Sequence, residues 1–177
     1  PFPQYSNFSA WDTYRAQHPL LLLTAPAQSA DMVNSLVSRH TVAGLELPVW
    51  ECLGHDNICM IGYSTVPILA DAILKGVPGI DVEGAYRAMC HAATSNDKHS
   101  QTYGPCGMDH YLRWNFVPAE IGCSVSKTTE YNYYDWTISR VARLLGRRGE
   151  ARRQEQVGDA PPHDGDRQLV LKLPVQC

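Results

Sequence analysis

The chain has 177 residues, of which 44% are apolar and 19% charged, with a net charge of −3. This length suits one domain with a buried core, and the composition is that of a folded protein rather than a disordered one. No basic stripe with interleaved aromatic residues is present, so we expect no nucleic-acid partner. The longest strongly apolar run, around residues 19–23, is far too short to cross a bilayer, so we expect no membrane span.

Helical signals recur from the N-terminus to about Gly146. The first predicted helix is capped by Ser9 and runs through Trp11 and Tyr14. A second carries an apolar stripe at helical spacing over residues 32–40 and ends at Gly44, which suits the position just after a helix.

Four further elements follow in the same way. A helix is predicted from residue 64 or 65 to 76, and apolar side chains surround it so completely that we expect burial on most sides. Others are predicted over 81–93, capped by Asp81, over 108–115, and from 124 or 126 to about 145. No β-type alternation of any length interrupts the series, so the predicted fold class is all-α. The packed face of the last helix is predicted to hold Tyr131, Tyr134, Ile138, Val141 and Leu145.

Composition changes after residue 146, where a highly charged run is followed by turn-forming residues. Residues 168–175 have the pattern of a short strand. We predict two regions, a helical domain over 1–146 and a disordered, irregular C-terminal tail over 147–177.

The six cysteines are widely spaced and form no CxxC pair, which argues against a zinc ribbon. We single out no metal-ligating residue in this chain. Free thiols are the simplest interpretation, while the even number also permits disulfides in an exported protein. The cysteines are Cys52, Cys59, Cys90, Cys106, Cys123 and Cys177.

Three stretches carry a more specific pattern. They are FSAWDTYRAQHPLL (8–21), LPVWECLGHDNICMIGYS (47–64) followed by VPILADAILKG (66–76), and SVSKTTEYNYYDW (124–136). In order and spacing they resemble the catalytic domain of family 92 glycoside hydrolases, which are calcium-dependent exo-acting α-mannosidases.

The resemblance implies an (α/α)6 barrel, of which this chain would hold about half, because twelve helices of about 11–12 residues with their loops need a longer chain. It implies mannose-containing glycans as partners, calcium as cofactor and a secreted or periplasmic location. The catalytic base and most calcium ligands of the family would lie outside this chain. A half barrel also leaves an apolar inner face uncovered, so self-association through that face is expected.

An inverting glycosidase needs one carboxyl to protonate the leaving oxygen and a second to activate water. At the position of Asp56 the family most often has a glutamate, its general acid. The aspartate is shorter by one bond, about 1.5 Å of reach, and Glu51 is the fallback donor. The alternative is that Asp56 caps a turn beginning near Asn57 while Glu51 is solvated.

The resemblance also implies a mannose subsite that includes Trp11 and Asp12, since sugar sites combine aromatic platforms with carboxylates. For Asp12 the alternative is a capping box with Ser9. Trp50 and His55, which flank the carboxylates, complete the predicted substrate-binding set together with Glu130. For Glu130 the alternative is an ion pair with the lysine three residues earlier.

These patterns predict a fragment of an inverting α-mannosidase that hydrolyses terminal α-linked mannose, with little or no activity alone. The alternatives are a non-catalytic truncated product or a weak carbohydrate-binding module. A barrel enzyme acting on a different sugar is a third interpretation.

Overall fold

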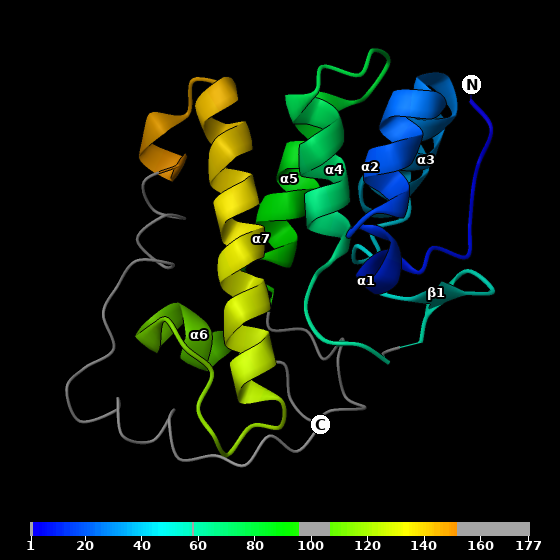
Figure 1. The fold of residues 1–177 in the computed structure, drawn as a ribbon. Helices are drawn as coiled ribbons and strands as arrows, with labels where there is room; N and C mark the ends of the chain where they lie inside the picture. Colours follow the sequence, from blue (N-terminus) through cyan, green and yellow to red (C-terminus); the bar gives the residue numbers. More distant parts are fainter. Residues whose placement is uncertain (1, 58, 96–106, 152–177) are drawn as a thin grey trace.

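The computed structural model describes residues 2–57, 59–95 and 107–151. Within them the chain is mostly helical, which confirms the predicted helical class (Figure 1). A small antiparallel hairpin of two strands, β1 and β2, was not predicted. The elements are α1 (Ala10–Thr13), α2 (Gln17–Thr24), α3 (Pro26–Thr41), β1 (Glu51–Cys52), β2 (His55–Asp56), α4 (Thr65–Leu74), α5 (Val82–Ala92), α6 (Met108–Trp114) and α7 (Ser124–Leu144).

Most helix ends follow the local signals. Asp81 accepts a hydrogen bond from the Gly84 N–H at 2.9 Å and caps α5 as predicted. Gly44 and Gly76 follow α3 and α4 with φ of +65° and +67°, a conformation that glycine adopts without strain. The second predicted helix begins earlier than its apolar stripe, because Pro26 occupies a first-turn position of α3 that favours proline.

The first predicted helix is shorter than expected. It ends at Thr13, and a separate helix, α2, begins at Gln17. Ser9 makes no side-chain bond to a helix N–H; its hydroxyl donates to Asp12 Oδ2 at 2.6 Å instead. Ser9 therefore occupies the N-cap position as predicted but makes no capping bond, and its bond to Asp12 is not that of a capping box.

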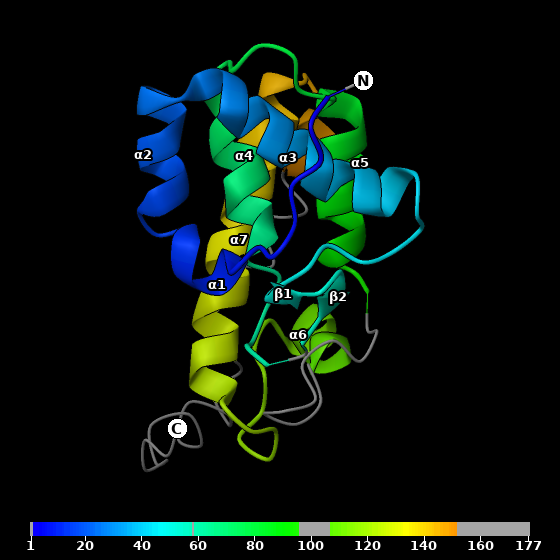
Figure 2. The same cartoon turned by 90° about the vertical axis from the view of Figure 1, so that its right-hand side faces the viewer.

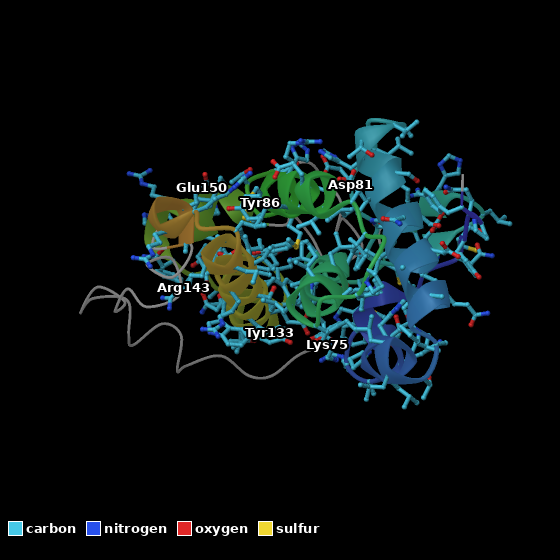
Figure 3. The ribbon with its side chains drawn as sticks, turned by 90° about the horizontal axis from the view of Figure 1, so that it is seen from above. Lys75, Asp81, Tyr86, Tyr133, Arg143 and Glu150 are labelled. Atoms are coloured by element: carbon cyan, nitrogen blue, oxygen red, sulfur yellow. The ribbon has the colours of Figure 1, made fainter. Side chains whose placement is uncertain are left out.

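The helices lie in two rows. Seen from above, α2, α4 and α7 form one row, and α3 and α5 form a second row packed against it (Figure 3). Successive long helices thus alternate between the rows. As predicted, α4 is buried on most sides: Asp71 is half-buried, Leu74 is exposed, and its other residues are buried. The predicted packed face of α7 also lies in the core, with Leu145 partly buried beside it.

A buried carboxyl joins α7 to its neighbours. Asp135 is 1% exposed and accepts hydrogen bonds from the hydroxyls of Tyr63 at 2.9 Å and Tyr111 at 3.0 Å. Desolvation raises the pKa of Asp135 to about 7, although both hydrogen bonds act in the opposite direction. This network connects α6 and the segment before α4 to α7.

After α7 the chain turns back onto α5. Arg147 donates to both carboxylate oxygens of Glu83 at 2.8 Å. The Tyr86 hydroxyl donates to Glu150 at 2.6 Å, and both residues are labelled in Figure 3. Ala151 is buried. The rest of the predicted tail, including the predicted strand over 168–175, lies outside the described residues.

Two further points concern the described residues alone. Their helices include none that is both long and apolar enough to cross a membrane. Their four cysteines are free thiols, with Cys52 exposed and Cys59, Cys90 and Cys123 half-buried.

Candidate active site

The three motif stretches meet at one end of the α2–α4 row. Figure 2 shows α1 and β1 below α2 and α4, on the side where α4 begins. Backbone bonds join α1 to the hairpin segment: Trp11 N–H donates to Val49 O at 3.2 Å and Glu51 N–H donates to Phe8 O at 2.7 Å. An ion pair of 2.8 Å between Arg15 and Glu130 joins the same region to α7. Residues more than a hundred positions apart therefore share one site.

Asp56 stands in β2, half-buried, and faces Glu51 across the ladder. Its carboxylate accepts the Val49 N–H at 2.8 Å and the Trp50 N–H at 3.4 Å. Both donors precede Asp56 in the chain, so the side chain closes a loop behind it. The alternative, in which Asp56 caps a turn beginning near Asn57, stays a prediction.

Glu51 is fully buried and paired with Arg39 of α3, so the expectation that it is solvated is wrong. Its side chain has no exposed surface, whereas Asp56 keeps some. Of the two residues, Asp56 is therefore the more exposed.

A chain of hydrogen bonds runs from the hairpin to α1. The Trp50 indole N–H donates to Ser9 Oγ, and Ser9 in turn donates to Asp12 Oδ2 at 2.6 Å. Within the described residues no bond is made to Asp12 Oδ1. That oxygen has the character of an acceptor for a hydroxyl group.

Arg15 lies at the centre of the site, a placement that the motif did not predict. Its guanidinium carbon is 4.8 Å from the centre of the Trp11 ring and 4.6 Å from that of Tyr14. It also donates to Trp11 O at 3.1 Å. One face of Trp11 is therefore covered by a cation, and a sugar ring has only the other face on which to stack.

Glu130 lies in the first half of α7 with two partners that the sequence did not suggest. It accepts from Arg15 at 2.8 Å and from the hydroxyl of Tyr134. Desolvation raises the pKa of Glu130, while Arg15 acts in the opposite direction. His55 is exposed on the hairpin, opposite Cys52.

The donor set does not fit calcium. Among the described residues, no group of three or more His, Cys, Asp or Glu side chains is arranged to hold a metal ion. The carboxylates of the site are instead committed to backbone N–H groups, Arg39, Ser9 and Arg15.

A groove of about 610 Å³ runs beside the site along α2, α4 and α7. The side chains of Tyr133 and Trp136 are stacked with ring centres 6.2 Å apart and both are exposed. The groove is lined by Tyr14, Arg15, Pro19, Pro67, Ala70, Asp71, Leu74, Lys75, Tyr133, Trp136 and Thr137.

Aromatic and carboxylate side chains gathered at one end of a helix row are groups that suit a carbohydrate ligand. The chain belongs to the glycosyl hydrolase family 92: the model of that family's catalytic domain matches residues 2–158. This match begins before the first motif and ends beyond the third.

Solved structures agree. The chain is similar to the family GH92 α-mannosidase BT3965 from Bacteroides thetaiotaomicron, with 37% identity and a TM-score of 0.79 over 89% of this chain and 20% of that chain. That enzyme has also been solved in complex with mannoimidazole. The inverting mannosidase BT2199 from Bacteroides thetaiotaomicron VPI-5482 gives 34% identity and a TM-score of 0.80 over 88% of this chain and 21% of that chain.

The chain thus spans about a fifth of the length of these solved relatives. The comparison with curated proteins gives no match.

Proposed function

We propose that this chain carries the proton-donor part of an inverting α-mannosidase active site, of a class that hydrolyses terminal α-linked mannose from glycans. Family membership and the α-mannosidase activity of the two relatives support the reaction class. The observation that carries the proposal is that hydrogen bonds bring Asp56, Trp50, Asp12 and Trp11 together at one site.

In this proposal Asp56 gives its proton to the leaving oxygen of the glycoside. Water attacks the anomeric carbon from the opposite face, activated by a carboxylate about 6.5–9.5 Å away. That second carboxylate belongs to a part of the domain outside this chain. Glu51 does not donate, because its buried side chain is held by Arg39.

The remaining predicted residues form the substrate side of the site. Asp12 accepts a sugar hydroxyl at Oδ1, and Trp11 offers the ring face that Arg15 leaves open. Trp50 and His55 border the leaving group beside Asp56, and Glu130 holds Arg15 in place. The proposal assigns no calcium ligand to the residues of this chain, and proton donation by Asp56 requires none.

We also propose that α2, α4 and α7 belong to an inner ring and α3 and α5 to an outer ring of an (α/α)6 barrel. The alternation of successive helices between two packed rows supports this. Residues 148–151 are also helical and bury Ala151, so the folded part extends past residue 146. Without the other helices, the groove side of the inner row stays open and drives self-association.

Ligand binding tests the proposal without requiring turnover. Adding methyl α-mannoside to the ¹⁵N-labelled chain should move the indole N–H signals of Trp11 and Trp50. Methyl α-galactoside should move them less, because its hydroxyl geometry differs. Asp12→Asn, which keeps the side-chain shape, should weaken the response. Equal responses to both sugars, or movement of the Trp114 and Trp136 signals alone, would exclude a mannose subsite here.

Turnover tests the second half of the proposal. The chain alone should release no measurable product from an aryl α-mannoside, because it lacks the base. Release that Asp56→Ala abolishes would show that this chain is itself a complete catalyst.

A further inference from the structure

The hairpin that carries Asp56 is attached to α3 by one side chain. Arg39, in the last turn of α3, donates through Nη1 to Glu51 Oε1 and through Nη2 to the Gly54 carbonyl at 2.9 Å. Only 17% of the Arg39 side chain is exposed. A planar guanidinium therefore binds β1 and the hairpin turn at the same time, a geometry that a lysine does not reproduce.

The hairpin needs this external support. Each strand has only two residues, and a short isolated hairpin is marginally stable in water. Leu53 and Gly54 have φ of +53° and +80°, as a tight two-residue turn requires. That conformation suits Gly54 but is strained at Leu53, a leucine that is 86% exposed. Besides Arg39, the Asn7 side chain holds the turn by accepting the Leu53 N–H at 3.0 Å.

The position of the Asp56 carboxylate depends on the same hairpin. Asp56 pairs with Glu51 across the ladder, and its oxygens bind the N–H groups of Val49 and Trp50 just before β1. If β1 shifts against β2, these bonds lengthen together. A misplacement of about 1 Å in a proton donor can cost about a hundredfold in rate.

We propose that Arg39 is a positioning residue, whose bonds to Glu51 and to the Gly54 carbonyl fix the hairpin and thereby the place of the Asp56 carboxylate. Glu51 then anchors the hairpin to α3 and is not itself the proton donor. The catalytic meaning rests on the proposed function of Asp56, but the geometry can be tested without activity.

The amide protons of Val49 and Trp50 report the carboxylate directly, because their shifts respond when a hydrogen-bonded carboxyl ionises. In the unmodified chain a pH titration should move both signals, and Asp56→Asn should abolish the movement. In Arg39→Lys, which keeps the charge but not the fork, the movement should fall about twofold or more, because hydrogen bonds weaken steeply with distance and angle.

Arg87→Lys is the matched control. Arg87 pairs with Glu83 at 3.8 Å on the exposed side of α5 and does not touch the hairpin. Arg87→Lys should leave the pH-dependent movement of the Val49 and Trp50 amide signals unchanged. A general loss of stability lowers the melting temperature without reducing the titration amplitude of the folded protein. An undiminished amplitude in folded Arg39→Lys would therefore overturn the positioning role.

A double variant keeps the test open if Arg39→Lys does not fold. Arg39→Met with Glu51→Leu replaces the ion pair by apolar side chains, which buried sites often accept. It should fold and show the reduced movement, because Gly54 has lost its donor. Failure of both variants to fold would assign Arg39 a purely structural role. Absence of mannoside binding in the unmodified chain would overturn the proposed function and leave the positioning result intact.

Discussion

Replacing Asp135 by asparagine should change how stability depends on pH. The carboxyl is buried among the hydroxyls of Tyr63 and Tyr111, and its pKa rises from 3.8 to about 7 on folding. Burial also raises the pKa of both tyrosines, so they stay neutral over the range of interest. The titration between pH 4 and pH 8 at this site therefore belongs to Asp135.

The direction of the pH dependence follows from the raised pKa of Asp135 in the folded protein. Below the unfolded pKa the carboxyl is protonated in both states, and its contribution to stability is fully present. As pH rises toward the folded pKa, the unfolded chain releases its proton first, so the free energy of unfolding falls. The two pKa values differ by about 3, and one pKa unit corresponds to about 1.4 kcal/mol, so the loss is about 4 kcal/mol.

Asparagine should fit the site. It offers one acceptor oxygen and one NH₂ donor in the same shape as the carboxyl. The tyrosine that loses Asp135 as its acceptor has a second acceptor nearby. The Tyr63 hydroxyl lies 3.3 Å from the Tyr131 carbonyl oxygen, and the Tyr111 hydroxyl lies 2.7 Å from Asn132 Oδ1.

Urea unfolding at constant ionic strength from pH 4 to pH 8 measures the effect. The difference in unfolding free energy, Asp135→Asn minus unmodified chain, should be near zero at pH 4 and rise by about 4 kcal/mol by pH 8. Asp109→Asn, at an exposed position on α6, controls for the loss of one acidic side chain. A flat difference curve for Asp135→Asn would refute the reasoning.

Three other predictions concern packing and surface. A Cβ at Gly62, where φ is +82°, would lie 2.7 Å from Tyr134 Cε2, so Gly62→Ala should cost more than about 2 kcal/mol in denaturant unfolding. Gly44→Ala, at φ +65° with open space, should cost only about 1 kcal/mol, and equal costs would contradict the clash. Burial lowers the pKa of His18, so its contribution to stability is lost as pH falls below 6.5. His18→Phe should remove that loss in urea unfolding over the same pH range. The same decrease in unfolding free energy below pH 6.5 in His18→Phe would contradict this assignment. Trp136→Ser should weaken self-association, measured by sedimentation, by about tenfold or more, since burying an aromatic side chain contributes about 1.5–3 kcal/mol; Leu112→Ser, exposed on α6, should not, and equal effects would place the contact elsewhere.

Local patterns predicted the helical elements well. Apolar residues on nearly all sides of α4 and along one stripe of α7 predicted both helices and their buried faces. They could do so because helical periodicity is a property of neighbouring residues. Asp81 and the glycines after α3 and α4 marked ends for the same reason. The hairpin was missed because two-residue strands are too short to show alternation.

The site was predicted as a set of residues but not as a set of contacts. Asp56, Asp12 and Trp11 stand out in motifs that can be read along the chain. The partners of the other two carboxylates lie elsewhere in the chain: Arg39 is 12 residues from Glu51, and Arg15 is 115 residues from Glu130. The Tyr63 hydroxyl reaches Asp135 across 72 residues. The sequence by itself determined most of the helices and the family to which the chain belongs. Only the tertiary structure decided which carboxylate is buried, which is paired and which stays accessible, because burial and ion pairing depend on side chains that distant parts of the chain bring together.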